Sequence, residues 1–198
     1  MIDVVAGNVY DKYGTRNPVA RWLMSRFLQA IREVYDARPE ETVVEIGCGE
    51  GELLARMRSW RPARRMVALD LSDAILREAR ARHGLIVAAQ SAEALALRDG
   101  AADIVVASEV LEHLPDPLAA LQEIARVARR RVILSVPREP VWRALNCARL
   151  RYLGDLGNTP GHVQHFSSDA FVRLVSRCLR VVEVKTPLPW TVVAAEPV

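Results

Sequence analysis

A glycine-rich turn between a buried strand and a helix constrains this chain more than any other stretch. Residues 42–46 (Thr-Val-Val-Glu-Ile) are rich in β-branched side chains, which predicts a buried strand. Gly47, Gly49 and Gly51 follow at alternate positions, and residues 52–57 then favour a helix. Glycine permits a sharp turn and lets a ligand approach the backbone closely. The free N–H groups of the first helical turn would lie beside that ligand.

The spacing of these glycines distinguishes the turn from a dinucleotide-binding fingerprint. That fingerprint is Gly-x-Gly-x-x-Gly, with a pyrophosphate over the helix N-terminus. Here the pattern is Gly-x-Gly-x-Gly, and Glu45 precedes it on the strand. A carboxylate in this place would repel a phosphate but would suit a cationic ligand. An ordinary tight turn is the alternative, although three glycines in five residues would be an odd choice for one.

The stretch Glu-Ile-Gly-Cys-Gly-Glu-Gly, residues 45–51, resembles motif I of class I S-adenosylmethionine (AdoMet) methyltransferases. The resemblance implies AdoMet as cofactor and S-adenosylhomocysteine as product. It also implies that Glu45 lies near the ammonium of the methionine moiety. Gly47, Cys48 and Gly49 would then pass beneath the cofactor.

Asp70 ends the next predicted strand, residues 65–70. It follows the glycines by about 20 residues, where a carboxylate can accept both ribose hydroxyls of a nucleoside. A plain loop acid or helix cap is the alternative role for Asp70. The neighbouring Leu71 joins the cofactor-binding residues that the resemblance implies.

Further cofactor contacts implied by the resemblance follow the third and fourth predicted strands, residues 85–89 and 102–107. Ala92 and Glu93 match the turn that borders adenine in the family, although a glutamate often simply begins a helix. Ser108, directly after the fourth strand, completes this set.

Strands alternate with helices along most of the chain, which predicts an α/β fold with a doubly wound, Rossmann-like sheet. The remaining predicted elements are helices at 18–37, 73–82, 118–128, 141–150 and 167–178, and strands at 131–137, 181–185 and 190–195. We expect seven strands, mostly parallel with an antiparallel C-terminal strand, and helices on both faces. Length favours one domain, residues 1–198.

Two segments are expected to cover the site. Residues 1–37 would form an N-terminal helical cap, in which Tyr13 either covers the cofactor, as tyrosines do in related enzymes, or simply packs. Residues 138–166 break the alternation of strand and helix, and we expect them to form a lid over the carboxyl edge of the sheet, where open α/β sheets bind ligands.

The stretch 108–117, Ser-Glu-Val-Leu-Glu-His-Leu-Pro-Asp-Pro, resembles the branch that holds the ubiquinone-biosynthesis O-methyltransferases and many small-molecule enzymes. One departure follows it. The branch's usual Leu-Lys-Pro-Gly-Gly turn before the fifth strand is replaced by Val-Ala-Arg-Arg-Arg at residues 127–131, which leaves the shape of this loop open.

His113 and His162 are the predicted catalytic residues. An imidazole titrates near neutral pH, so it can accept a proton from an acceptor hydroxyl or ammonium. Glu109, Glu112, His113 and His162 also resemble the metal ligands of small-RNA 3′-end 2′-O-methyltransferases. A divalent metal is not favoured, because the two glutamates can cap the turn and many enzymes with this motif need none.

Three functions stay open at this point. The favoured one is methyl transfer from AdoMet to a small-molecule acceptor. The alternatives are a metal-dependent 2′-O-methyltransferase acting on RNA 3′ ends or a catechol-type acceptor, and a non-catalytic AdoMet-binding partner protein. Intact motifs argue against the last, and cofactor binding without any turnover would favour it.

Charge and composition limit the kinds of binding partner that this chain can have. The net charge is only +3, and the 27 basic residues are arginines apart from Lys12 and Lys185. They are spread along the chain as on solvated helix faces, which argues against nucleic acid. We expect no membrane span, no signal peptide and no disulfides from the three scattered cysteines, hence a cytoplasmic protein. The oligomeric state, including a homodimer, stays open.

Overall fold

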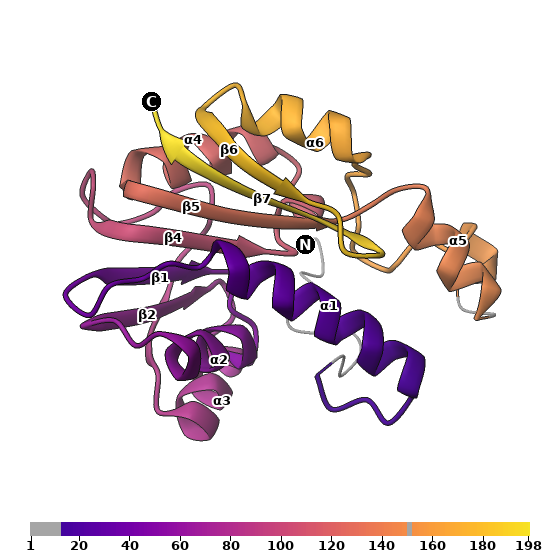
Figure 1. The fold of residues 1–198 in the computed structure, drawn as a ribbon, viewed down its shortest axis with the longest axis horizontal. Helices are drawn as coiled ribbons and strands as arrows, with labels where there is room; N and C mark the ends of the chain where they lie inside the picture. The colour runs from indigo at the N-terminus through magenta and orange to yellow at the C-terminus, as the bar shows by residue number, and fades with distance from the viewer. Residues whose placement is uncertain (1–12, 150–151) are drawn as a thin grey trace.

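The computed structural model describes residues 13–149 and 152–198, which fold around one seven-stranded sheet (Figure 1). The strands are β1 (Thr42–Ile46), β2 (Arg65–Asp70), β3 (Ile86–Ala89), β4 (Ala102–Ser108), β5 (Ala128–Pro137), β6 (Leu179–Lys185) and β7 (Trp190–Pro197). Their order is β3-β2-β1-β4-β5-β7-β6. The first five strands run parallel, whereas β7 lies antiparallel between β5 and β6. The predicted fold class is confirmed.

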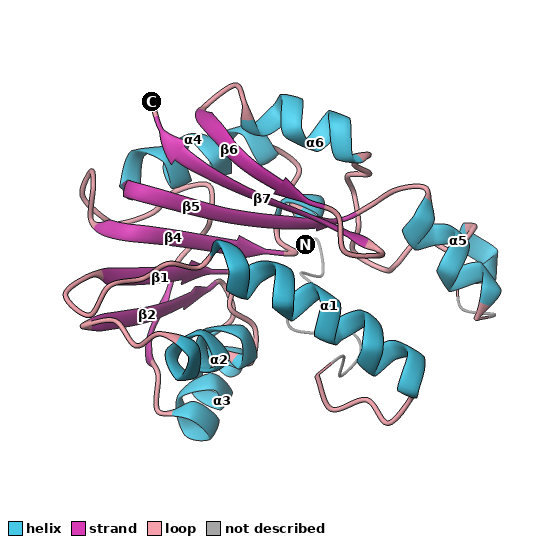
Figure 2. Cartoon of the chain, in the orientation of Figure 1, coloured by secondary structure: helices cyan, strands magenta, loops and turns pink. Residues whose placement is uncertain are grey.

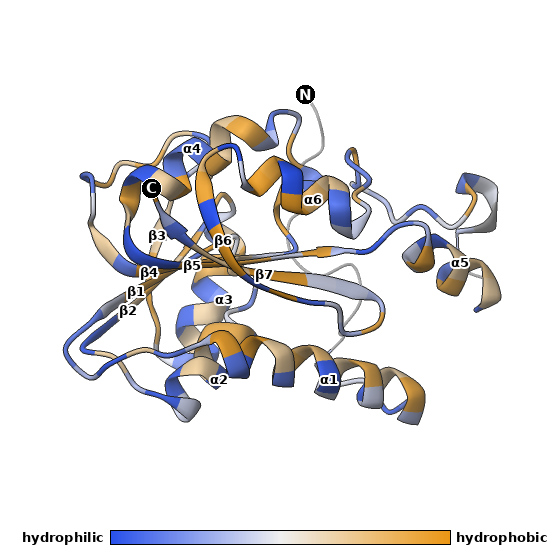
Figure 3. Cartoon of the chain, turned by 45° about the horizontal axis from the view of Figure 1, so that its top comes forward, coloured by the Kyte–Doolittle hydropathy of each residue, from blue (hydrophilic) through white to orange (hydrophobic). Residues whose placement is uncertain are grey.

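Helices cover both faces of the sheet (Figures 2 and 3). They are α1 (Pro18–Val34), α2 (Glu52–Trp60), α3 (Asp73–His83), α4 (Pro117–Val127), α5 (Val141–Ala148) and α6 (Ser168–Val175), with short 3₁₀ turns η1 (Leu111–His113) and η2 (Leu153–Asp155). One face carries α1, α2 and α3, and the other carries α4 and α6. The segment with α5 extends beyond the sheet (Figure 1).

Two hydrophobic cores follow from the alternation of strand side chains. Successive residues of a strand point to opposite faces. Val43 and Val106 accordingly join the core beneath α1 and α2, whereas Val44 and Val105 join the core beneath α4 and α6. Because both faces are buried, the central strands are almost continuously apolar, which is why they were visible in the sequence.

Several element boundaries differ from the prediction. The fifth strand begins at Ala128 rather than 131, because Ala128 pairs with Ala102 of β4 and the arginine run continues the strand. The first helix ends at Val34 rather than 37, since Tyr35 takes an extended conformation and its hydroxyl donates to the carbonyl of Arg61.

The last elements also shift. The sixth helix ends at Val175 rather than 178, and β6 begins at Leu179 rather than 181 because Leu179 pairs with Pro197. The end of the predicted 141–150 helix reaches position 150, which lies outside the described residues. None of the described helices has the length and apolar character needed to cross a membrane.

Candidate active site

The glycine turn after β1 takes a left-handed backbone at all three glycines. The φ angles are +66° at Gly47, +52° at Gly49 and +78° at Gly51, a region that side chains rarely adopt. Close packing adds a second requirement at two of them. A Cβ on Gly47 would lie 2.4 Å from Val110 Cγ2, and one on Gly51 would lie 2.5 Å from Leu85 Cδ1. These two glycines therefore also serve contacts within the protein, a role that the sequence did not show.

Asp70 fixes the shape of this turn. Its carboxylate accepts the N–H of Gly49 at 3.0 Å through Oδ2 and the N–H of Ser72 at 3.0 Å through Oδ1. The N–H of Cys48 donates to the carbonyl of Leu69 at 2.9 Å, which ties the turn to β2. A carboxylate oxygen has a second lone pair, so these bonds are compatible with the predicted ribose contact. Leu71, the next residue, is 57% exposed.

Glu45 is almost fully buried beneath the turn. Its exposed fraction is 2%, and Oε2 accepts the N–H of Leu54 at 3.2 Å in the first turn of α2. The carboxylate therefore lies at the positive end of a helix dipole. Burial raises the pKa of the Cys48 thiol, and the charges of Glu45 and Asp70 raise it further. Cys48 is thus a neutral thiol and a poor nucleophile.

Tyr13 lies beside the same turn. Burial raises the pKa of its hydroxyl, and Glu45 raises it further. The guanidinium of Arg56 lies over the Tyr13 ring, 4.8 Å from the centroid. The structure therefore brings Tyr13 and Glu45 together from separate segments. Residues 1–12 of the predicted cap lie outside the described residues.

The turn after β3 holds Ala92 and Glu93 next to Asp70. The N–H of Gln90 donates to the carbonyl of Asp70 at 3.0 Å, and Ser91 forms a bridge with Ala94. The N–H of Glu93 donates to Ser91 Oγ at 3.3 Å. Glu93 thus belongs to a compact turn and does not begin a helix. The glycine turn, Asp70 and this turn lie at the same edge of the sheet.

A salt bridge on α4 secures the chain beyond that turn. Glu123 accepts the N–H of Leu95 at 2.8 Å, and Arg126 donates to the carbonyls of Leu95 and Leu97. Arg126 also binds Glu123 at 2.7 Å. Hydrogen bonding from Arg126 lowers the pKa of Glu123 to about 2, helped by the Leu95 N–H.

The carboxyl end of β4 turns sharply at Glu109. Ser108 Oγ lies 2.9 Å from Ser135 Oγ on β5. Glu109 has a φ of +56°, a strained conformation for a residue with a side chain, and strain of this kind gathers at functional sites. Its N–H donates to the carbonyl of Ser135, and its carboxylate accepts the indole N–H of Trp190.

Three of the four proposed metal ligands come together. One ligand atom from each of Glu112, His113 and His162 lies within 4.8 Å of the others. Glu109 is not part of this group, because its carboxylate binds Trp190. His113 Nδ1 donates to the carbonyl of Gly161 at 3.0 Å, which leaves the lone pair of the neutral ring on Nε2.

Residues 138–166 are attached to η1 through their backbone. The N–H groups of Val163 and Gln164 both donate to the carbonyl of Glu112, at 2.9 and 3.0 Å. Trp142 on α5 lies 6.2 Å from the His162 ring and 5.7 Å from the Trp190 ring, measured between centroids. His162 is consequently only 9% exposed.

Trp190 is the main site residue that the sequence did not reveal. It begins β7, is 4% exposed, and packs against Phe27 with ring centroids 4.7 Å apart. It joins α1, α5 and the strained Glu109 turn. The sequence shows only a single tryptophan at the start of the last strand, and a tryptophan there is equally expected in an ordinary hydrophobic core.

Comparison with known proteins supports the class suggested by this edge of the sheet. Residues 44–136 match the family model described as a methyltransferase domain. The chain is 36% identical over 109 residues to a ubiquinone biosynthesis O-methyltransferase of Nitrosomonas europaea, covering 52% of this chain and 45% of that protein. It is 30% identical over 92 residues to a malonyl-[acyl-carrier protein] O-methyltransferase of Hahella chejuensis, covering 45% of this chain and 33% of that protein.

A solved structure with the same fold is magnesium protoporphyrin IX methyltransferase of Synechocystis with bound S-adenosylhomocysteine. The TM-score is 0.68 at 19% identity, over 93% of this chain and 90% of that one. The family model over residues 44–136, the motifs and the fold all support the predicted class, the class I AdoMet-dependent methyltransferases. The predicted cofactor is therefore confirmed as the cofactor of its class. The chain spans less than half the length of the two curated relatives named above.

Proposed function

We propose that this chain transfers a methyl group from AdoMet to a small-molecule acceptor. The observation that carries the proposal is the left-handed glycine turn whose Gly49 N–H is held by Asp70. This arrangement leaves three backbone positions without a Cβ beside a carboxylate, which suits a nucleoside with a cationic chain better than a phosphate. AdoMet supplies a sulfonium-bound methyl group that is already electrophilic.

The residues of this chain would bind and orient the two reactants. Glu45 would meet the ammonium of AdoMet, Asp70 the ribose, and Ala92 and Glu93 the adenine. Tyr13, next to Glu45, would cover the methionine end. Gly47, Cys48, Leu71 and Ser108 complete the proposed cofactor contacts. Holding an acceptor in line with the methyl group is the main catalytic task.

His113 and His162 are the proposed bases for the acceptor's proton. The bond from His113 Nδ1 to Gly161 fixes a tautomer whose Nε2 can accept a proton. Residues 138–166 would act as the acceptor lid, because they carry His162 and pack Trp142 against it. The two relatives differ in acceptor, so the acceptor's identity is not transferred from either.

An acceptor screen tests the function directly. Metabolite extracts incubated with methyl-labelled AdoMet should yield a labelled small molecule with the wild-type chain. Asp70→Ala should weaken S-adenosylhomocysteine binding by about 1.5–3 kcal/mol, the usual range for hydrogen bonds to a charged group. Cofactor binding with no labelled product from any extract would instead support a non-catalytic partner protein.

The histidine roles have their own test. Replacing either His113 or His162 by alanine should lower the rate about 10²–10⁴-fold and remove one limb of the pH profile. Arg173→Ala, at an exposed position on α6, is the control and should keep the rate. Turnover that survives the double replacement of His113 and His162 would show that positioning alone suffices.

A metal-dependent methyltransferase is the second candidate, favoured by the grouping of Glu112, His113 and His162. One carboxylate and two imidazoles suit zinc or iron better than magnesium. A chelator should then abolish turnover, and manganese or zinc should bind with a stoichiometry that Glu112→Gln reduces. Full turnover in chelator would exclude this candidate.

A further inference from the structure

A second pocket lies within residues 138–166, apart from the methyl-transfer site. It is an open pocket of about 400 Å³, and Glu139, Arg143, Cys147, Leu156 and His165 contribute to its walls. Glu139, Arg143 and Cys147 recur every four residues, so they share one stripe at and before α5. The residues of the His113–His162 cluster do not line this pocket.

Glu139 lines this pocket and carries one buried carboxylate oxygen. Its Oε1 has no hydrogen-bond partner among the residues that the structure describes, whereas Oε2 accepts the N–H of Arg143 at 3.4 Å. Burial raises the pKa of this carboxyl, although that N–H and the charges of His165 and Arg143 act in the opposite direction. A buried oxygen without a donor is costly, so the Glu139 carboxylate would be stabilised by a donor group from a ligand.

Arg143 supplies a fixed positive charge to the same pocket. Its Nε donates to the carbonyl of Leu156 at 2.9 Å, which anchors the guanidinium to the pocket wall. Within the described residues, Arg143 makes no ion pair with Glu139 or any other carboxylate. His165 is held as well, since its Nε2 donates to Asn158 Oδ1 at 2.9 Å. Opposite charges thus line one small pocket without neutralising each other.

We propose that this pocket binds the amino-carboxylate group of a small zwitterionic ligand. The ammonium of the ligand would bind the Glu139 carboxylate, and the carboxylate of the ligand would bind the guanidinium of Arg143. A ligand with only an ammonium would lie beside the like charge of Arg143, and one with only a carboxylate beside Glu139. Leu156 and Cys147 offer an apolar wall for the remainder of the ligand.

The pocket is connected to the methyl-transfer site through Asn158. The side-chain amide of Asn158 accepts from His165 in the pocket and donates to the carbonyl of His162 at 3.3 Å. The imidazole signals of His165 therefore report occupancy of the pocket. His83, at the end of α3, does not line the pocket and provides an internal reference. The proposal does not depend on methyl transfer taking place.

The test is a titration followed by the NMR signals of the four histidines. L-leucine carries both charges, its methyl ester only the ammonium, and N-acetyl-leucine only the carboxylate. We expect saturable shifts of the His165 signals with L-leucine alone, and none at His83. Glu139→Gln and Arg143→Gln should each weaken binding about 10-fold or more, as expected for loss of a charge-assisted bond. Arg173→Gln, an exposed arginine on α6, should leave binding unchanged.

Two results would overturn the proposal. One is the absence of a saturable shift with L-leucine, and the other is binding that survives both pocket substitutions. S-adenosylhomocysteine titrated into the same samples shows that each variant is folded. It also separates failure of this pocket from failure of the cofactor site.

Discussion

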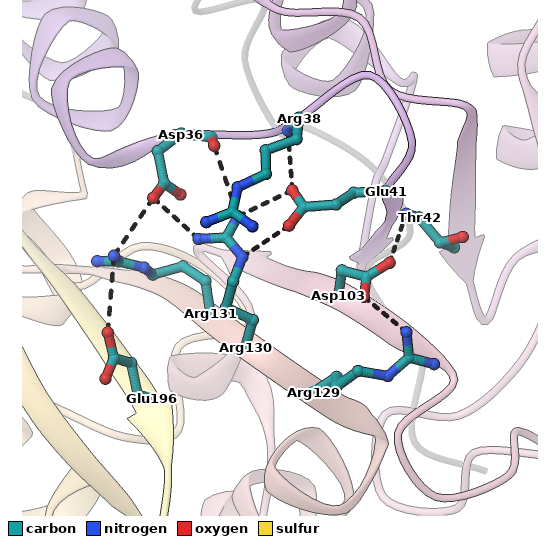
Figure 4. A network of polar contacts seen from close by, with 9 residues as sticks. All are labelled: Asp36, Arg38, Glu41, Thr42, Asp103, Arg129, Arg130, Arg131 and Glu196. Carbon is teal, nitrogen blue, oxygen red and sulfur yellow. Dashed lines mark hydrogen bonds and ion pairs between the residues drawn. The ribbon is translucent and has the colours of Figure 1, made fainter.

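The carboxyl ends and the amino ends of the strands differ in backbone conformation and in how their charged side chains are paired. At the carboxyl ends of the strands, a left-handed glycine turn and the strained Glu109 place irregular backbone beside acidic side chains. At the amino ends, three consecutive arginines of β5 each find an acidic partner (Figure 4). The carboxyl ends thus contain strained backbone, whereas the charged side chains at the amino ends form ion pairs within the protein. Strain of this kind gathers where proteins bind ligands.

Arg130 is the centre of the network at the amino ends. It binds both carboxylate oxygens of Glu41, at 2.7 and 2.9 Å, and Asp36 at 2.9 Å. Arg131 lies 3.4 Å from Asp36 and 3.7 Å from Glu196. Burial alone would raise the pKa of Asp36, but the hydrogen bond and charge of Arg130, with the charge of Arg131, outweigh it and lower the pKa.

Arg129 extends the network to the neighbouring strands. It pairs with Asp103 at 2.8 Å, and Asp103 also accepts the N–H of Thr42 at 2.8 Å. The arginine run therefore joins the start of β5 to the starts of β1 and β4. It replaces the glycine-containing turn of related enzymes with a strand held by ion pairs. We interpret this end as the stabilising end of the sheet.

The largest expected effect is a loss of cofactor affinity when a glycine at the carboxyl ends of the strands is replaced, compared with a glycine at the amino ends. Gly49→Val should abolish S-adenosylhomocysteine binding in calorimetry, because the side chain would occupy the proposed cofactor path. Gly100→Val is the matched control at the amino end, with a φ of +58° and only Arg129 Nε within 4 Å of a Cβ. Both should lose about 1–2 kcal/mol of unfolding free energy from the left-handed backbone. Equal affinity in both variants would refute the site assignment.

A smaller effect is expected at the arginine network, and on stability alone. Arg130→Met should lower the free energy of unfolding by about 3 kcal/mol, since it leaves Glu41, whose side chain is 7% exposed, without its main partner. Arg129→Met should cost at most about 1 kcal/mol, because Arg129 is 55% exposed. Denaturant titrations measure both, and cofactor affinity should not change. Equal losses in the two variants would contradict the role given to Arg130.

The smallest effect is a pH dependence beside the proposed adenine turn. The folded pKa of Glu123 is lowered from 4.5 to about 2, first by the hydrogen bond from Arg126. Its stabilisation is therefore present above pH 4.5 and lost as the pH falls toward 2. The difference in unfolding free energy between wild type and Glu123→Gln should shrink over this window. Glu78→Gln, in an exposed pair with Arg82, should show almost no difference at any pH.

The sequence was sufficient for the fold and for most of the proposed cofactor edge. Periodicity and the glycine turn predicted seven strands, and spacing alone pointed to Asp70. The sequence leaves the shape of the arginine run at residues 127–131 open, because the partners of these arginines lie far away in the chain. Glu41 precedes Arg130 by 89 positions, and only the sheet register brings them together.

The structure of the site differs from the sequence prediction at the backbone turn that follows β4. Glu109 and Glu112 look equivalent in the sequence, but the positive φ at Glu109 separates them and directs the carboxylate of Glu109 to Trp190. The role of Trp190 depends on β7 inserting beside β5, where Trp190 pairs with Pro137. Local patterns carry no information about either contact.

Hydrogen exchange with and without S-adenosylhomocysteine tests the contrast between the two ends most directly. Ligand binding stabilises the segments that it contacts and slows their exchange. Exchange should slow at residues 46–51, 70–72 and 90–93, and should stay unchanged at residues 36–42 and 128–131. Protection at the amino ends alone, or no change at residues 46–51, would contradict the placement of the cofactor at the carboxyl edge of the sheet.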